Sequence, residues 1–299
     1  MSAVQSPTAH RSVWVATIVA CFVLVHPLMS AGAPDDPGPG GYVFLDVEGR
    51  PLPFQDHETI CEAMRTATIV SEEPTNRGVG GSLKLVLDHD GTRFHAIFRV
   101  VNETVYTSPV LKKKKLAYRD SAIFEVAAYE IDRMLGINRV PPAVPRSIEG
   151  RDGSLQIWME ATTPEDVLLR EDRLVPPDLA DWRRQKQVMR VFDCLVANTD
   201  RNQGNVLIDR SWRLWFIDHT RTFGESTKLA EADKITTCER RLWAALREID
   251  EAAVRRRLEP YLTGKQISRL LKRRVKLVDH IQQQIDENGE EAVLYDLEP

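Results

Sequence analysis

The segment from Asn198 to Asp218 constrains this chain most, because it places three oxygen-bearing side chains at a fixed spacing. Asp200 lies in a polar stretch, Asn205 follows five positions later, and Asp218 ends an apolar run thirteen positions after that. Carboxylate and amide oxygens are ligands that Mg²⁺ prefers. The spacing is typical of a phosphoryl-transfer site, with Asp200 acting on the acceptor hydroxyl and Asn205 and Asp218 holding the metal.

Each member of this set also has a plainer interpretation. Asp200 follows Asn198 and Thr199, and such a run satisfies a capped polar turn without any ligand. Asn205 begins a predicted strand, where asparagine is unfavourable unless it has a ligand or a structural hydrogen bond. Asp218 follows buried apolar residues, where a charge is costly unless it is paired or bound to metal. The three together are more specific than any one of them.

The composition is that of a globular protein without a nucleic-acid partner. The chain has 299 residues, enough for one large domain or two small lobes, and a formal net charge of −4. A nucleic-acid binder needs an excess of basic residues, which this chain lacks. The short basic runs 112–115 and 272–274 are expected to be solvated surfaces.

The N-terminus has the pattern of a targeting segment. Arg11 precedes a thirteen-residue apolar run, 13–25, and the small residues Ala31-Gly32-Ala33 follow. The apolar run is shorter than the roughly 20 residues that span a membrane, so we expect a secretory signal peptide cleaved after Ala33. An uncleaved anchor is the second choice. The protein is thus expected to be secreted or extracytoplasmic, with a membrane contact only through that segment.

The cysteines predict neither a disulfide framework nor a metal site. Cys61, Cys194 and Cys238 remain after the leader, an odd number with no short spacing. One bridge and a free thiol, or three buried thiols, are both compatible with this count. We favour burial for Cys194, which lies in an apolar helical segment.

The first half of the chain is predicted to be rich in strands. Residues 78–100 indicate a hairpin, because Leu83, Leu85 and Leu87 alternate with other residues before a turn at 88–91. Residues 120–135 have helical periodicity and stop at Gly136. An extended segment at 140–144 and a strand at 155–160 follow.

The second half is predicted to be mostly helical. Helices are expected over 181–197 and over most of 240–287, with short strands at 206–208 and 214–217 between them. This order predicts an α+β, two-lobed, protein-kinase-like fold with a β-rich N-lobe, one main helix and a helical C-lobe. The expected boundaries are 1–33 signal peptide or anchor, 34–77 linker and N-terminal extension, 78–160 N-lobe and 161–299 C-lobe.

Two further segments suit a nucleotide phosphate site. Gly78, Gly80 and Gly81 precede the first strand of the hairpin, and glycines let backbone N–H groups approach phosphates. A plain turn explains these glycines equally well. Glu125, in the first turns of the predicted helix, is the candidate to tether a phosphate-binding cation, and Glu130 is its rival.

The chain resembles the atypical kinase group that includes the phosphatidylinositol 3-/4-kinases, the HipA-like kinases and the secretory-pathway protein and sugar kinases. Residues 124–144 resemble the first-lobe helix and the strand after it, and residues 193–223 resemble the catalytic and metal-binding loops. This resemblance implies Asp200 as catalytic aspartate, Asn205 and Asp218 as metal ligands, and Glu125 as the helix glutamate. It also implies that 158–160, ending in Glu160, meets adenine through backbone groups.

The chain departs from the pattern of that group at three positions. Arg99 stands where the group has a strand lysine that contacts phosphates, and the two cations are not interchangeable. Lys84 on the neighbouring strand is an alternative source of the charge. Asn202 replaces the usual histidine, and His219 follows the metal aspartate.

Three functions are compatible with these residues. The first is a phosphotransferase that uses ATP and Mg²⁺, with Mn²⁺ as an alternative, to modify a hydroxyl on a protein, sugar or lipid. The second, which the Arg99 departure motivates, is a pseudokinase that binds nucleotide or a partner without turnover. The third is a non-catalytic interaction domain.

Overall fold

The computed structural model describes residues 41–75, 81–106 and 117–297 of the chain. The chain divides into two units, residues 1–33 and 34–299, and every described residue belongs to the second. The expected signal segment, together with Gly78 and Gly80, therefore lies outside the described residues.

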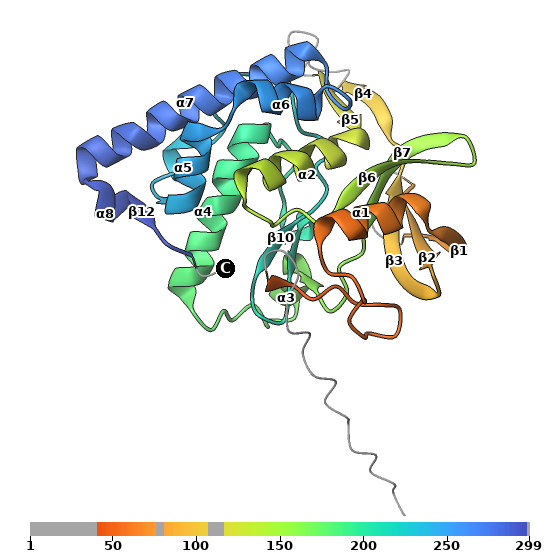
Figure 1. Cartoon of the computed structure of the whole chain (residues 1–299). Coiled ribbons are helices and arrows are strands. Elements are labelled where there is room, and N and C mark those ends of the chain that lie inside the picture. The colour runs from red at the N-terminus through yellow and green to blue at the C-terminus, as the bar shows by residue number, and fades with distance from the viewer. Residues whose placement is uncertain (1–40, 76–80, 107–116, 298–299) are drawn as a thin grey trace, which may run out of the picture. The chain divides into compact units, whose positions relative to one another are not determined.

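A five-stranded antiparallel sheet forms the first lobe (Figure 1). Its strands, in spatial order, are β1 (Thr68–Pro74), β2 (Leu83–His89), β3 (Thr92–Arg99), β7 (Arg151–Ile157) and β6 (Ala143–Ile148). A separate hairpin joins β4 (Asn102–Tyr106) to β5 (Ala117–Ser121).

The β2–β3 hairpin was predicted from alternation, and the structure confirms it. Leu85 pairs with Ala96 and Leu87 pairs with Phe94, and all four side chains are buried on one face of the sheet. The turn between the strands includes Gly91, whose φ of 80° is a conformation that glycine adopts without steric cost. The opposite face of the hairpin carries the more polar side chains of both strands.

The sheet lobe also includes residues that precede the expected boundary at 78. Helix α1 (His57–Thr66) begins at the cap Asp56, whose carboxylate accepts the Thr59 N–H, and packs on β6. Ile60 and Met64 of this helix are fully buried, and β1 pairs with β2 along its length. The proline- and glycine-rich start of the segment 34–77 gives no sign of the amphipathic helix that follows it.

Helix α2 (Ile123–Leu135) connects the sheet lobe to the helical lobe. It contacts β6 and β7 on one side and α5 (Arg240–Glu248) and α6 (Glu251–Leu258) on the other. Most of its residues are buried, since it has neighbours on nearly all sides. Gly136 ends the helix with a left-handed φ of 68°, as the sequence predicted.

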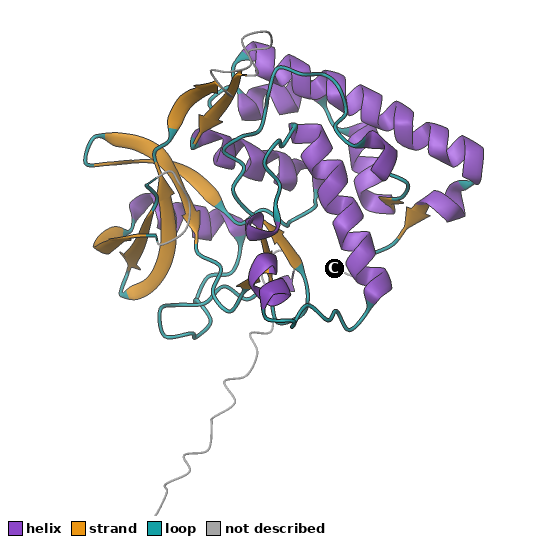
Figure 2. Ribbon diagram, turned by 180° about the vertical axis from the view of Figure 1, so that it is seen from behind, coloured by secondary structure: helices purple, strands orange, loops and turns teal. Residues whose placement is uncertain are grey.

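The second lobe is helical (Figure 2). Besides α5 and α6, its helices are α3 (Glu165–Arg170), α4 (Leu179–Val196), α7 (Gly264–Asn288) and α8 (Glu290–Val293). Helix α4 packs against α7, where the fully buried Arg273 donates to the Leu195 carbonyl at 2.7 Å. The structure thereby confirms the expected α+β two-lobed arrangement.

Short strands and turns lie between the helices. The strands β8 (Thr163–Pro164), β9 (Val206–Ile208) and β10 (Leu214–Phe216) form a small antiparallel sheet, and β11 (Cys238–Glu239) pairs with β12 (Leu294–Tyr295). The single-turn helices η2 (Gln203–Asn205) and η3 (Ala232–Lys234) complete the elements. The β9–β10 hairpin positions the site, because Asn205 precedes it and Asp218 follows it.

The structure bears on the expected state of the cysteines and on the expected membrane contact. Within the described residues, Cys61, Cys194 and Cys238 are all buried and carry free thiols. None of the helices in the described ranges is both long enough and apolar enough to cross a membrane.

Candidate functional site

The end of helix α4 places Asp200. Ala197 ends the helix in a left-handed conformation, and the Asn198 side chain then donates to Asp193 Oδ1 at 2.9 Å. The Asn198 Oδ1 accepts the peptide N–H of Asp200 at 3.0 Å. This turn fixes the backbone of Asp200 and leaves its carboxylate to other partners.

Asn205 is oriented by the backbone of the same loop. Its Nδ2 donates to the Asp200 carbonyl at 3.1 Å, and Asn202 donates to the same carbonyl at 2.9 Å. Asn202 also caps η2 by accepting the Gly204 N–H. With its nitrogen engaged, the amide of Asn205 has its oxygen available as a metal ligand.

Asp218 has a left-handed backbone conformation, with a φ of 61°. A positive φ is uncommon outside glycine, although aspartate tolerates it better than most residues. The Thr220 hydroxyl lies 3.3 Å from Asp218 Oδ1. Unusual backbone conformations of this kind concentrate at functional sites.

Arg201 fastens the Asp200 loop to the Asp218 loop. Its guanidinium forms two bonds to the Asp193 carboxylate, at 2.9 and 3.0 Å. It also donates to the carbonyls of Asn205 and Ile217, the residues at the open end of the β9–β10 hairpin. One partly buried cation therefore connects the backbone next to the two candidate metal ligands.

Glu125 is fully buried and accepts three hydrogen bonds. His219 donates its peptide N–H to Oε2 at 2.8 Å and its Nδ1–H to Oε1 at 2.9 Å, and Gln156 donates to Oε1 at 3.0 Å. Burial opposes ionisation, but the interaction with His219 and the charge of Arg99 lower the pKa of Glu125 to about 2. The carboxylate is therefore ionised at neutral pH.

The hydrogen bonds of His219 define its tautomer. Arg201 Nη2 lies 3.0 Å from His219 Nε2. A guanidinium has no acceptor atom, so Nε2 must accept the hydrogen bond from Arg201. Nδ1 must then carry the ring proton, which it donates in the hydrogen bond to Glu125. A continuous chain of hydrogen bonds thus runs from Asp193 through Arg201 and His219 to Glu125.

A cavity of about 680 Å³ lies beside these loops. Asn205, Asp218 and Arg99 line it together with Gln156 and the segment 157–159. Only 9% of Arg99 is exposed, and its Nη1 is buried with no hydrogen-bond partner among the described residues. An unpaired buried guanidinium is costly, and an anion in the cavity would relieve that cost.

Asp200 is held near this cavity without lining it. Its Oδ2 accepts from Arg221 at 2.9 Å, and the same guanidinium donates to Asp120 at 2.8 Å. The carboxylate of Asp200 is more than a third exposed. Arg221 therefore links the Asp200 loop to the end of β5.

Other predicted residues occupy different surroundings. The ammonium of Lys84 lies 4.7 Å from the centre of the Trp158 ring, and Lys84 is not among the residues that line the cavity. Glu160 pairs with His95 at 2.5 Å, and its carbonyl accepts the Tyr42 hydroxyl. Gly81 has a φ of 63° just before β2.

Glu130, the rival of Glu125, faces away from the site. It pairs with Arg257 of α6, a bond between α2 and the helical lobe. Five positions separate the two glutamates, so they project from different sides of the helix. Glu125 is the one in contact with the Asp218 loop.

Protein groups alone form no complete metal cage in the part of the chain that the structure describes. No group of three or more His, Cys, Asp or Glu side chains gathers there. A nucleotide site needs fewer protein ligands, because Mg²⁺ keeps several waters and takes oxygens from the phosphates. Asn205 and Asp218 suit that arrangement.

Sequence reasoning did not assign roles to several residues of the site. Arg201 and Arg221 act through long side chains across loops, Asp193 accepts from Arg201 at the end of α4, and Gln156 reaches Glu125 from a strand. Arg201 was visible only as the residue after Asp200, and His219 only as a departure from a pattern. Nothing in the local sequence marks Arg221 or Gln156.

Known structures share this fold. No family model matches the chain, and no curated protein matches it in sequence. The structure of hydra Fam20 with sugar is similar, with a TM-score of 0.59 and 17% identity over 80% of this chain and 92% of that one. The Golgi casein kinase has a TM-score of 0.56 and 15% identity over 80% and 79%.

A further structure, the Golgi casein kinase with Mn/ADP bound, also has a TM-score of 0.56 and 15% identity, over 81% and 80% of the two chains. At these identities the likeness establishes the fold. The chain has a two-lobed, kinase-like fold.

Proposed function

We propose that this protein is an ATP- and Mg²⁺-dependent phosphotransferase that acts on a hydroxyl group. One observation carries the proposal: Arg99, Asn205 and Asp218 line a single cavity of about 680 Å³, and the buried Nη1 of Arg99 has no partner among the described residues. A phosphate group supplies the acceptor that this guanidinium lacks. The two oxygen donors nearby suit the cation that accompanies a nucleotide.

Each residue has a distinct role in this proposal. Asn205 and Asp218 would hold Mg²⁺ or Mn²⁺, and Arg99 would contact the phosphates. The backbone of 158–159 would meet the base, since these residues line the same cavity. The bound metal neutralises charge on the phosphates during transfer.

Asp200 would orient the acceptor hydroxyl and take its proton. Its carboxylate is partly exposed, as an acceptor-facing group must be, and Arg221 holds it at 2.9 Å. Asn198 fixes its backbone. Protein, sugar and lipid kinases all need this aspartate and differ in the shape of the pocket that binds the acceptor. We therefore propose no narrower class than a hydroxyl-bearing substrate.

The comparisons support the nucleotide and the compartment. One structure of similar fold is described with Mn/ADP bound, and another with sugar. The Golgi kinases among them agree with a secretory signal at 1–33 and an extracytoplasmic location. N-terminal sequencing of the protein purified from both the secreted and the membrane fraction tests this: a mature chain beginning at Pro34 supports cleavage, and a membrane-bound chain that retains residue 1 supports the anchor.

A pseudokinase is the second candidate, and two observations favour it. The helix glutamate Glu125 accepts its hydrogen bonds from His219 and Gln156, and none from Arg99. Arg99 also replaces a lysine, which has a different shape and reach. Such a protein would bind nucleotide through the same cavity without transferring phosphate.

Two measurements separate these candidates. Thermal stabilisation by ADP with Mg²⁺ or Mn²⁺ reports binding, and we expect Asp218→Ala to abolish it while Asp200→Ala retains it. ATP consumption reports catalysis, and we expect both variants to lose it. If the wild type and both variants all fail to consume ATP, only the pseudokinase is left. If millimolar nucleotide gives the wild type no thermal shift, both candidate functions are refuted.

A further inference from the structure

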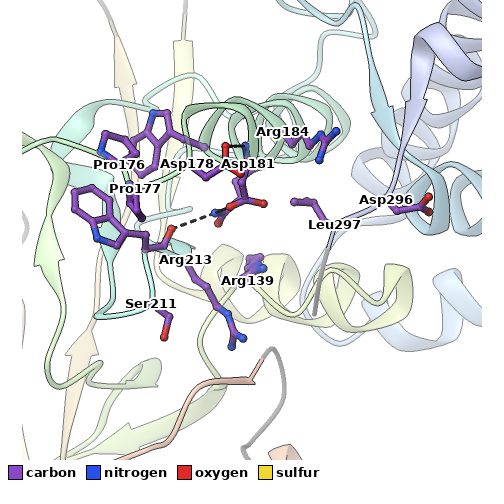
Figure 3. Close-up of a pocket in the computed structure, with 13 residues that line it drawn as sticks. Arg139, Pro176, Pro177, Asp178, Asp181, Arg184, Ser211, Arg213, Asp296 and Leu297 are labelled. Carbon is purple, nitrogen blue, oxygen red and sulfur yellow. Dashed lines mark hydrogen bonds between the residues drawn. The ribbon is translucent and has the colours of Figure 1, made fainter.

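A second cavity, of about 600 Å³, lies at the start of helix α4, next to the turn between β9 and β10. Figure 3 shows the side chains around it, with Arg139 among them. Its lining residues differ entirely from those of the cavity that Arg99 lines. It therefore needs an explanation separate from nucleotide binding.

The central feature of this cavity is the guanidinium of Arg139. Only 9% of this residue is exposed, and its Nη1 is buried with no hydrogen-bond partner among the described residues. The backbone is fixed, because its N–H donates to Asp132 at 3.0 Å and its carbonyl accepts from Phe216 at 2.8 Å. Burial and the charge of Arg213 lower its pKa to about 10, so it stays charged at neutral pH.

The carboxylates of the cavity are engaged elsewhere. Asp178 caps α4 by accepting the N–H groups of Ala180 and Asp181, and Asp181 accepts from Gln185 at 2.7 Å. Asp296 lies 3.7 Å from Arg240. None of these three acids bonds to Nη1 of Arg139, although the charges of Asp209, Asp132 and Asp181 act on the guanidinium and raise its pKa.

The remaining walls combine aromatic and apolar side chains with polar ones such as Gln185 and Ser211. Trp182 and Trp212 meet edge to face with ring centres 6.1 Å apart, and both line the cavity beside Pro176 and Pro177. The backbone of Trp212 is fixed by its carbonyl, which accepts from Gln185 at 3.1 Å. Arg184, also at the wall, is exposed and adds a second cation.

We propose that this cavity binds a small organic anion, with a carboxylate or phosphate group on Arg139 and a ring against Trp182 and Trp212. A guanidinium forks onto two oxygens of such a group, and a planar ring packs well on indole. Sites of this kind are concave and mostly apolar, with a few placed polar groups. The proposal does not depend on the kinase function.

Binding to the full chain can be measured by tryptophan fluorescence and calorimetry with phenyl phosphate, benzoate and inorganic phosphate. We expect phenyl phosphate or benzoate to bind at least about tenfold more tightly than inorganic phosphate, because only they reach the indoles. The preferred one identifies the charged group. Binding should persist in saturating ADP with Mg²⁺.

Arg139→Leu should weaken binding by at least about tenfold, and the exposed Arg184→Ala by a few-fold without loss of folding. Arg99→Leu, the matched change in the other cavity, should leave it unaltered. The proposal is overturned if Arg139→Leu folds and binds as the wild type does, if ADP competes with the probe, or if Arg184→Ala and wild type both fail to bind it.

Discussion

His219 donates both its peptide N–H and its Nδ1–H to the carboxylate of Glu125, at 2.8 and 2.9 Å, where neither side chain is exposed. The two residues are 94 positions apart and belong to the central helix and the Asp218 loop. Because Glu125 is held in this way, the position of α2 and the position of the candidate metal loop are coupled. The first prediction tests this coupling.

Glu125→Gln should lower the free energy of unfolding by about 3 kcal/mol at pH 7, because a carboxamide cannot accept all three hydrogen bonds. The folded-state pKa of Glu125 is about 2, below its ordinary value. Its contribution is therefore present above about pH 4.5 and is lost as pH falls toward 2. Urea unfolding at pH 7 and at pH 3 should show a smaller difference between the two proteins at the lower pH.

Arg201→Lys should destabilise the protein by about 2–4 kcal/mol, because one ammonium cannot reproduce the bonds to Asp193 and two loop carbonyls. The same change at exposed Arg173 is the control and should have an effect within about 0.5 kcal/mol. Chemical denaturation measures both. Equal effects of the two changes would mean that Arg201 does not fasten the loops.

Arg99→Met should separate binding from stability. Removing a buried guanidinium with an unpaired nitrogen should change the unliganded melting temperature little, since no bond of that nitrogen is lost and the loss of its charge interaction with Glu125 is offset by the removal of a buried charge. The stabilisation by ADP with Mg²⁺ should fall to near zero, whereas Arg99→Lys should retain part of it. A normal ADP shift in the methionine variant would contradict the assigned role of Arg99.

Arg221→Gln should reduce phosphoryl transfer by about tenfold or more without changing nucleotide binding, because Arg221 positions Asp200 and does not line the nucleotide cavity. Arg221→Lys should recover part of the rate, since it keeps a cation between Asp120 and Asp200. Steady-state rates and ADP melting shifts, measured on the same preparations, test both statements. Weakened nucleotide binding would argue instead for a structural role.

Asp132→Asn should stabilise the protein more at high pH than at low pH. Burial raises the pKa of Asp132 to about 7, so the stability it contributes in the protonated form is lost as pH rises from about 4 to 7. An asparagine keeps the bond from the Arg139 N–H and has no charge to bury. We expect its melting temperature to exceed the wild type's by about 3 °C at pH 8, with a smaller excess at pH 5.

Local periodicity was sufficient to predict much of the fold. The hairpin at 83–99, the helix ending at Gly136 and the helix before Asp200 were predicted, because each has a repeating apolar pattern and a clear stop. Helix α1 was missed, since it follows a segment whose composition indicates a linker. The two-lobed order followed from strands preceding helices.

The candidate site was only partly predictable. Asp200, Asn205 and Asp218 are close in sequence, so their spacing carries information about their geometry. The partners of Glu125 are different, because Gln156 and His219 reach it from a strand and a loop that only the folded chain brings together. Arg139 likewise gave no signal, since a buried arginine cannot be told from an exposed one by its neighbours.

The start of α2 has a consequence for how a ligand enters. Ser121 donates its N–H to the Thr220 carbonyl at 2.9 Å, and one turn later Glu125 holds His219. These hydrogen bonds join the β5–α2 junction of the sheet lobe to the loop that follows Asp218. A movement of the two lobes away from each other would first have to break these bonds. We therefore expect a nucleotide to enter and leave through an opening of nearly constant width.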